Sequence, residues 1–302
     1  MRIGIAATLK NEAPYLLEWI AFHRIVGIRT FFISDNGGDD GTSRLLRQLH
    51  RAGIITRFDF IDREVPQLSV YTEMVPRMRD IVELVAIIDG DEFIRPLEGE
   101  RADQVIDAYF ADPAVSALAI NWACYGSGGQ CRGGRGLVTA RFRRRAEQGF
   151  SFNRLVKSIV RVDRFVSCTQ PHFSNLSHGR FIDTGGEDVR WDPRGEPGAL
   201  ARCTWRGVRI DHFAVKSLEE FETIKSRRGR GDMPLGHPKT WRGSDYFKRL
   251  DRNEVFDPMP AWLISRTKQE AFHLRWQMTP FMEAARKIFA MSKTVRSRSL
   301  RA

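Results

Sequence analysis

The sequence predicts an α/β fold built around a mostly parallel, doubly wound sheet with helices on both faces. Strand and helix patterns alternate through the first hundred residues, as is typical of a parallel sheet. The charge-free run over residues 84–88 indicates a strand that is buried on both faces. Three acids, Asp89, Asp91 and Glu92, follow where that strand should surface. Because open α/β sheets bind ligands outside the carboxyl ends of their strands, the sequence predicts a ligand site here.

The first half of the chain is expected to contain four strands separated by three helices. The strands are predicted over residues 3–9, 30–33, 54–60 and 84–88. The helices are predicted after Asn11 up to Gly27, from Asp40 to Gly53, and over residues 71–81 with a kink at Pro76. This order predicts right-handed crossovers between parallel strands.

After residue 96 the pattern changes, and a mixed structure is predicted. A helix over residues 102–110 and a strand over residues 114–122 precede a glycine-rich loop, short strands and long loops. Ser217 and Glu220 have the spacing of a capping box, which opens a further helix.

The chain is predicted to end in helices, over residues 262–278 and 281–291. We therefore expect one domain over residues 1–230, followed by a helical extension with a basic tail over residues 231–302.

The composition is that of an ordinary soluble globular protein, with 42% hydrophobic and 28% charged residues among 302. No apolar stretch approaches the roughly 20 residues that span a bilayer, and the chain begins directly in a strand pattern without a signal-peptide pattern. The four cysteines have no CxxC spacing, so neither a zinc ribbon nor a redox pair is indicated. We expect free thiols and a cytoplasmic protein.

The net charge of +11 is unevenly distributed. Residues 132–164 contain ten Arg and Lys against two acids, and residues 280–302 contain six against one. Such segments attract anionic lipid, nucleic acid or a phosphorylated substrate, but they are equally compatible with a solvated basic surface. Both interpretations stay open at this point.

Asp89 and Asp91 lie one residue apart, so they can share one hard divalent cation whose shell is completed by phosphate oxygens and water. The competing interpretation is that these are loop acids that only cap the helix after the strand. A phosphatase with an aspartyl nucleophile is disfavoured, because Phe93 occupies the position of its Thr or Val and the motif lies too far into the chain.

An ordered series of motifs resembles the glycosyltransferase family 2-like proteins that overlap with family 92 and have a GT-A fold. The resemblance covers roughly residues 1–230. The motifs are Lys10-Asn11-Glu12 with Glu18-Trp19, Asp35-Asn36 with Gly41-Thr42, Asp89-Gly90-Asp91-Glu92-Phe93, Asn121-Trp122, Val156-Lys157-Ser158, Pro171-His172-Phe173, and Asp211-His212-Phe213 with Lys216-Ser217 and Lys225.

The resemblance implies a metal-dependent enzyme that transfers a sugar from a nucleotide-diphosphate donor, foremost a UDP-sugar, to a glycan or lipid-linked acceptor. The implied cofactor is Mn²⁺ or Mg²⁺. Residues 1–95 would form the nucleotide-binding half, and residues 96–230 would form the acceptor and metal half.

The resemblance also implies roles for particular residues. The metal ligands would be Asp89, Asp91 and His212, with Glu92 in a supporting role. The nucleotide and its diphosphate would contact Thr8, Lys10, Asn11, Glu12, Asp35, Lys157 and Lys216, and Lys225 is a further cation for the diphosphate.

An inverting outcome is expected, which requires a general base to take the proton of the acceptor hydroxyl. Glu187 and Asp188 are the first candidates, with Asp183 beside them, and their order stays open. Asp211 is a weaker candidate because it adjoins a proposed metal ligand. His23, on a helix that packs against the sheet, is expected to be structural.

The alternative function is a non-catalytic polyanion-binding protein that uses residues 132–164. Nucleic acid is an unlikely partner, because the aromatic-interleaved motif of an RNA-binding sheet is absent. The basic segment and tail also suggest peripheral contact with the inner face of an anionic membrane.

Overall fold

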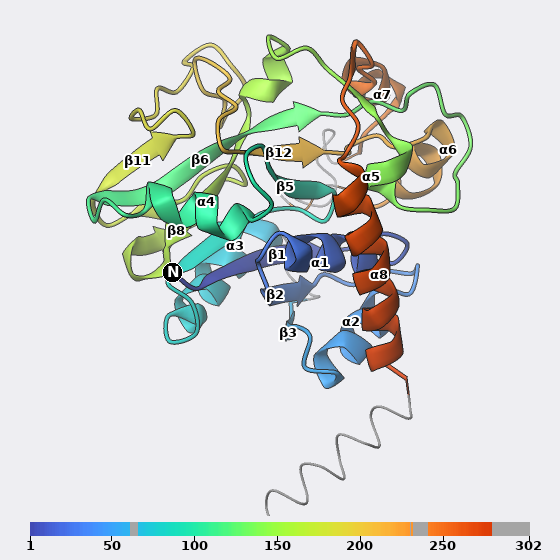
Figure 1. The fold of residues 1–302 in the computed structure, drawn as a ribbon, viewed down its shortest axis with the longest axis horizontal. Coiled ribbons are helices and arrows are strands. Elements are labelled where there is room, and N and C mark those ends of the chain that lie inside the picture. The colour runs from blue at the N-terminus through green and yellow to red at the C-terminus, as the bar shows by residue number, and fades with distance from the viewer. Residues whose placement is uncertain (61–65, 230, 232–240, 280–302) are drawn as a thin grey trace, which may run out of the picture.

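The computed structural model describes residues 1–60, 66–229, 231 and 241–279. Within them, the main sheet has the strand order β3-β2-β1-β4-β8-β6-β12-β5, and β11 pairs with β6 (Figure 1). Only β8 and β5 run antiparallel to their neighbours, so the predicted mostly parallel α/β sheet is confirmed. The strands are β1 Ile3–Leu9, β2 Thr30–Asp35, β3 Thr56–Asp59, β4 Leu84–Ile87, β5 Glu92–Pro96, β6 Val115–Cys124, β8 Val156–Arg161, β11 Arg180–Asp183 and β12 Val208–His212.

Helices lie on both faces of this sheet (Figure 1). The core on one face includes Trp19 and Phe22 of α1, and the core on the other includes Tyr71 of α3. The α-helices are α1 Leu16–Ile25, α2 Thr42–Arg51, α3 Pro66–Met74, α4 Ala102–Tyr109, α5 Val138–Arg141, α6 Leu218–Glu220, α7 Ser244–Leu250 and α8 Ala261–Gln277. None of the helices in the described ranges is both long and apolar enough to cross a membrane.

Two local expectations differ from the structure. Pro76 does not kink a continuous helix; α3 stops at Met74 and a 3₁₀ turn over Val75–Met78 follows, since proline cannot donate the α-helical hydrogen bond. Asn11 does not cap α1, which begins at Leu16. Asn11 instead adopts a left-handed backbone conformation, with φ of 53°.

Two antiparallel pairings, of β8 with β4 and of β12 with β5, bring the second half of the chain to the acidic motif. β8 lies between β4 and β6 and pairs Ser158 with Ile87, so Lys157 reaches the end of β4. β12 pairs with β5 so that His212 lies opposite Glu92. Residues roughly 70 to 120 positions apart in sequence therefore meet at one edge of the sheet.

The described part of the C-terminal segment packs on the rest of the fold. α8 runs along the flank of the molecule beside α1 (Figure 1), and Arg24 of α1 pairs with Glu270 at 2.8 Å. Asp257 accepts hydrogen bonds from Arg145 and Arg209. The helix predicted over residues 281–291 and the basic tail lie outside the described residues.

Candidate active site

The turn between β4 and β5 carries Asp89 and Asp91, with Gly90 between them. A Cβ atom on Gly90 would lie 2.8 Å from Leu9 Cδ2 and 3.1 Å from Glu12 Cγ, so the turn packs tightly against the loop after β1. The two carboxylates lie in different surroundings, because the Asp89 side chain is 31% exposed and that of Asp91 is 1% exposed.

Asp89 is bound by two side chains from different elements. Its Oδ1 accepts from Gln67 Nε2 of α3 at 2.8 Å, and its Oδ2 accepts from Lys157 Nζ of β8 at 2.9 Å. Burial alone would lower the pKa of Lys157, but Asp89 and Glu92 outweigh it and raise that pKa. Lys157 is therefore a fixed positive charge beside the turn.

Glu92 is fully buried and holds the turn from within. Its Oε2 accepts from the backbone N–H of Asp89 at 2.8 Å, whereas its Oε1 has no partner among the described residues. Burial raises the pKa of Glu92 to about 8. Lys157 acts against this increase, and the charge of Asp89 adds to it. Glu92 thus positions the aspartates through the backbone of Asp89.

Asp91 meets two cations from the segment that follows β12. Lys225 Nζ contacts its Oδ2, and Arg228 Nη2 lies 3.3 Å from the same oxygen. Burial would raise the pKa of Asp91, but Lys225 and His212 outweigh it and hold that pKa well below the usual value. Asp91 therefore remains a carboxylate although it is buried.

A short π-helix, η4 Phe221–Lys225, delivers Lys225 to this position. The wide turn is closed by the backbone N–H of Ser226, which donates to the carbonyl of Phe221 at 2.8 Å. The capping box predicted at Ser217 and Glu220 is confirmed and begins the short helix α6, which leads into η4. Single π turns of this kind occur frequently at functional sites.

The surroundings of Asp91 provide two ligands for a divalent cation. Asp91 Oδ1 and His212 Nε2 are 3.6 Å apart, which is longer than a hydrogen bond. Burial lowers the pKa of His212, so its imidazole is neutral, as a metal ligand must be. Among the described residues no group of three or more His, Cys, Asp or Glu side chains is arranged to hold a metal. The pair fits a hard cation only if phosphate and water supply the remaining ligands.

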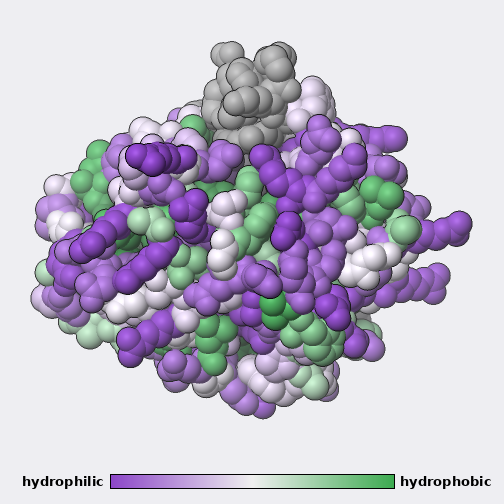
Figure 2. All heavy atoms as spheres, turned by 90° about the horizontal axis from the view of Figure 1, so that it is seen from above, coloured by the Kyte–Doolittle hydropathy of each residue, from purple (hydrophilic) through white to green (hydrophobic). Residues whose placement is uncertain are grey.

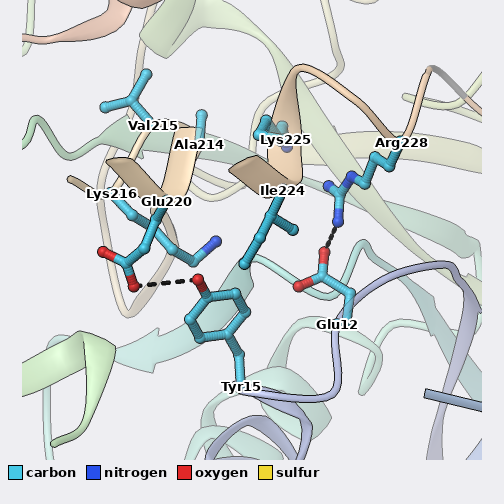
Figure 3. Close-up of a pocket in the computed structure, with 9 residues that line it drawn as sticks. All are labelled: Glu12, Tyr15, Ala214, Val215, Lys216, Glu220, Ile224, Lys225 and Arg228. Atoms are coloured by element: carbon cyan, nitrogen blue, oxygen red, sulfur yellow. Dashed lines mark hydrogen bonds and ion pairs between the residues drawn. The ribbon is translucent and has the colours of Figure 1, made fainter. Parts of the chain in front are cut away.

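A small pocket adjoins Asp91 on the side of the segment after β12 (Figure 3). The loop after β1 supplies Glu12 and Tyr15, and Tyr15 donates a hydrogen bond to Glu220 at 3.0 Å. The remaining lining residues are Ala214, Val215, Lys216, Ile224, Lys225 and Arg228. Six of the nine lining residues are ionisable, although much of the wall is formed by the apolar parts of their side chains.

The family model of glycosyltransferase family 92 matches residues 6–185, which is more than half of the chain. The matched region includes the loop after β1, both aspartates and Lys157. The chain belongs to glycosyltransferase family 92. The family, predicted from the ordered motifs, is thereby confirmed.

Relatives from plants agree with this family. A family 92 protein of Oryza sativa subsp. japonica is 27% identical over 182 residues, which are 60% of this chain and 30% of that protein. A family 92 protein of Ricinus communis is 28% identical over 131 residues, which are 41% of this chain and 23% of that protein. The alignments thus span less than a third of the length of these relatives.

Solved structures share only part of the fold. S. aureus TarS 1–349 in complex with UDP has a TM-score of 0.37 and 12% identity, covering 54% of this chain and 47% of that 1–349 chain. HddC from Yersinia pseudotuberculosis has a TM-score of 0.33 and 10% identity, covering 60% of this chain and 88% of HddC. Likeness of this degree supports no conclusion about the ligands of the family 92 chain.

Asp35, a predicted nucleotide contact, is fully engaged within the protein. Its Oδ1 accepts from the backbone N–H of Gly37 and from Ser43, and its Oδ2 accepts twice from Arg57, at 2.7 and 3.1 Å. Asp35 thus anchors the loop after β2, and its contact with a nucleotide stays a prediction.

Three further residues predicted to contact the donor, Thr8, Lys10 and Asn11, lie at the end of β1 and in the loop that follows it. Asn11 exchanges hydrogen bonds with Asp39, and Thr8 Oγ1 is buried without a described partner. Lys10 is half-buried in the same loop. The loop after β1 is therefore held by the neighbouring loop after β2. Its contact with a nucleotide stays a prediction.

The acids predicted as bases lie elsewhere. Asp188 forms an ion pair with Arg180 at 2.8 Å. Arg180 lies opposite Val115, at the start of β6. His212 lies opposite Cys124, at the other end of β6. That separation is roughly 30 Å at 3.3 Å per residue. Glu187 shares the exposed turn of Asp188. The structure does not bring these two residues to the aspartates, so we no longer assign them as bases.

Asp183 and Asp211 are also committed to internal contacts. Asp183 accepts a hydrogen bond from the backbone N–H of Gly185 in its own turn, and Asp211 is bound by Arg209 at 2.6 Å and Arg95 at 3.4 Å.

His23 is the structural histidine that the sequence predicted: its Nδ1 lies 2.8 Å from the carbonyl oxygen of Trp19, and its Nε2 accepts a hydrogen bond from the backbone N–H of Ile94.

Gln67 and Arg228 were missed as site residues by sequence reasoning. Gln67 is an amide on a helix and belongs to no motif. Arg228 lies among several basic residues that follow the capping-box helix in the sequence, where a solvated side chain is the usual expectation. The only available signal was its spacing of three residues from Lys225, which places both on one side of a helical turn.

Proposed function

We propose that this family 92 glycosyltransferase uses a nucleotide-diphosphate sugar, foremost a UDP-sugar, with Mn²⁺ or Mg²⁺ as cofactor. The observation that carries the proposal is Asp91, a buried carboxylate at a strand end, with His212 Nε2 at 3.6 Å and the cations Lys225 and Arg228 beside it. Carboxylate and imidazole donors suit the cation, and clustered cations suit the diphosphate.

Asp91 and His212 would hold the cation in this proposal, and Asp89 would support it from the adjacent position. When bound, the cation neutralises charge that develops on the departing diphosphate. Lys225 and Arg228, which contact Asp91 in the structure, would then be released to contact the diphosphate oxygens. Lys157 holds the Asp89 carboxylate in place.

The acceptor in this proposal is a glycan or a lipid-linked glycan, with inversion at the transferred carbon. We further propose a cytoplasmic protein, which is supported by four cysteines that are all free thiols. Peripheral contact with the inner face of the membrane is part of the proposal and requires an exposed surface that suits lipid.

A screen of nucleotide sugars for hydrolysis in the presence of Mn²⁺ tests this proposal. We expect one donor to be cleaved, and we expect Asp91→Asn to reduce the rate by at least about 10²-fold, the scale of losing one strong electrostatic contact. Asp245→Asn, an exposed acid on α7, is the matched control. Full activity of Asp91→Asn would refute the assigned site.

The alternative of polyanion binding has lost its main support. The surface in Figure 2 is mostly hydrophilic, but most cations of residues 132–164 are occupied inside the protein. The occupied cations and their partners are Arg141 with Glu220, Arg145 with Asp257, Arg154 with Asp192, Lys157 with Asp89, Arg161 with Val115 and Phe110 carbonyls, and Arg164 with Ser116.

A further inference from the structure

The pocket beside Asp91 contains two buried polar groups with unused hydrogen-bonding capacity. Glu12 is 2% exposed, and its Oε1 contacts Arg228 while its Oε2 has no partner among the described residues. Lys216 is 6% exposed, and its ammonium donates to the carbonyl of Phe213 at 3.2 Å. Figure 3 shows the Lys216 ammonium and the Glu12 oxygen that does not contact Arg228 on opposite sides of the Ile224 side chain, near Tyr15.

Both groups are held in place by the fold. Lys216 has a left-handed backbone conformation, with φ of 55°, which a residue other than glycine keeps only when its surroundings enforce it. Its ammonium lies 4.4 Å from the centre of the Tyr15 ring. The Glu12 backbone N–H donates to Thr42 Oγ1 at 2.8 Å, which fixes the other wall. Polar groups fixed in this way are preorganised for a ligand.

The chemistry of the two groups selects the ligand. The carboxylate oxygen requires a hydrogen-bond donor, and the ammonium requires an acceptor. A hydroxyl group satisfies both at once, whereas a phosphate would accept from Lys216 but would be repelled by Glu12. The pocket is small, which suits a single hydroxyl and excludes a whole sugar ring.

The position of the pocket indicates which hydroxyl it receives. Lys225 and Arg228 line the pocket and also contact Asp91, so the pocket adjoins the proposed diphosphate site. The loop after β1 contributes Glu12 and Tyr15, whereas no residue of β2 or β3, two other strands of the predicted nucleotide-binding half, lines the pocket. The sugar on the far phosphate therefore suits the pocket better than the ribose or the base.

We infer that this pocket binds one hydroxyl group of the sugar that the donor carries, with Glu12 Oε2 as acceptor and Lys216 Nζ as donor. The inference rests on the proposed function, which it deepens. It reassigns Glu12 and Lys216 from the nucleotide and its diphosphate to the transferred sugar. The pair would thus select donors by one hydroxyl position.

Donors that lack a single hydroxyl test the inference. The wild-type protein should cleave one deoxy donor at least about 10-fold less efficiently in kcat/KM than its parent, because buried polar groups would be left unpaired. In Lys216→Met, which keeps the apolar stem over Tyr15, this preference should fall to less than about 3-fold. Glu12→Gln should do the same. Lys248→Met, an exposed lysine on α7, should keep the full preference.

Binding of UDP with Mn²⁺, measured by calorimetry on the same variants, separates the possible outcomes. Unchanged UDP affinity in both variants, together with the lost preference, supports the inference. An equal fall in UDP and UDP-sugar affinity would overturn it in favour of a nucleotide contact. Equal cleavage of every deoxy donor by the wild type would also overturn it, since the pocket would then hold only water. A wild type that binds no UDP would refute the proposed function as well.

Discussion

Asp91 and Asp89 illustrate how single residues of one motif acquire different tasks. Asp91 is buried against cations that come from residues 225–228, whereas Asp89 is partly exposed and bound by Gln67 and Lys157. The sequence predicted both acids, because charges directly after a buried apolar run stand out. It did not predict their partners, since these are set by strand pairing and by a π turn that no local pattern specifies.

Lys225→Met tests the buried ion pair at Asp91 through both stability and activity. Removing the ammonium leaves a buried carboxylate with weaker compensation, so we expect the free energy of unfolding to fall by about 2–4 kcal/mol. Donor hydrolysis should fall by at least about 10²-fold. Urea denaturation and the hydrolysis assay measure the two effects. Lys248→Met should change stability by less than about 0.5 kcal/mol, and a Lys225→Met protein of wild-type stability would contradict the buried ion pair.

The buried His23 should make the stability of the protein depend on pH. Burial lowers the pKa of His23 to about 3, from a usual value of 6.5. Between these values the unfolded chain binds a proton that the folded protein does not, so stability falls as pH decreases from about 6.5 toward 3. The free energy of unfolding should fall by a few kcal/mol over this range, since each unit of pKa difference corresponds to about 1.4 kcal/mol. Denaturation at several pH values should show a shallower decline in His23→Gln, and an identical decline would exclude this source.

At the scale of elements, the segment after β12 does most to complete the site. Its capping box was predictable from Ser217 and Glu220, because that signal is local. Its continuation as η4 was not, because the π turn depends on tertiary contacts such as Lys225 with Asp91. The same limit explains the misplaced bases: the sequence showed acids near a glycine-rich turn but not that β11 lies at the start of β6.

Helix α8 is the element that suits the proposed membrane contact. Leu263 and Leu274 lie on the buried face of the helix. Phe272 and Trp276, which are four residues apart, lie on a different face of the helix and are 74% and 46% exposed. Lys268 and Arg275 are also exposed, which favours an anionic surface. We expect sedimentation with anionic liposomes, and we expect the double variant Phe272→Ser, Trp276→Ser to lose most of it.

The control for this prediction is Phe256→Ser, which removes an aromatic side chain that is 61% exposed on another element, β13 Val255–Phe256. It should bind liposomes as the wild type does. Donor hydrolysis should be unchanged in both proteins, because neither surface contributes to the site. Equal liposome binding by the double variant and the wild type would reject α8 as the contact surface.

At the scale of the whole molecule, the site is assembled where two halves of one sheet meet. β1 and β4 supply the first loop and the aspartates, while β8 and β12 bring Lys157 and His212 beside them. The alternating patterns predicted the parallel half well, since each βα unit is local. The antiparallel insertion of β8 joins residues about 70 positions apart, and only the motif resemblance hinted at it.

The most direct test of the account is UDP binding measured by calorimetry with Mn²⁺ and, separately, with a chelator. We predict that Mn²⁺ strengthens UDP binding by at least about 10-fold, and that Asp91→Asn and His212→Ala each abolish this gain while Asp245→Asn retains it. UDP binding of equal strength with and without the cation, or an undiminished gain in Asp91→Asn, would contradict a metal–diphosphate site at Asp91.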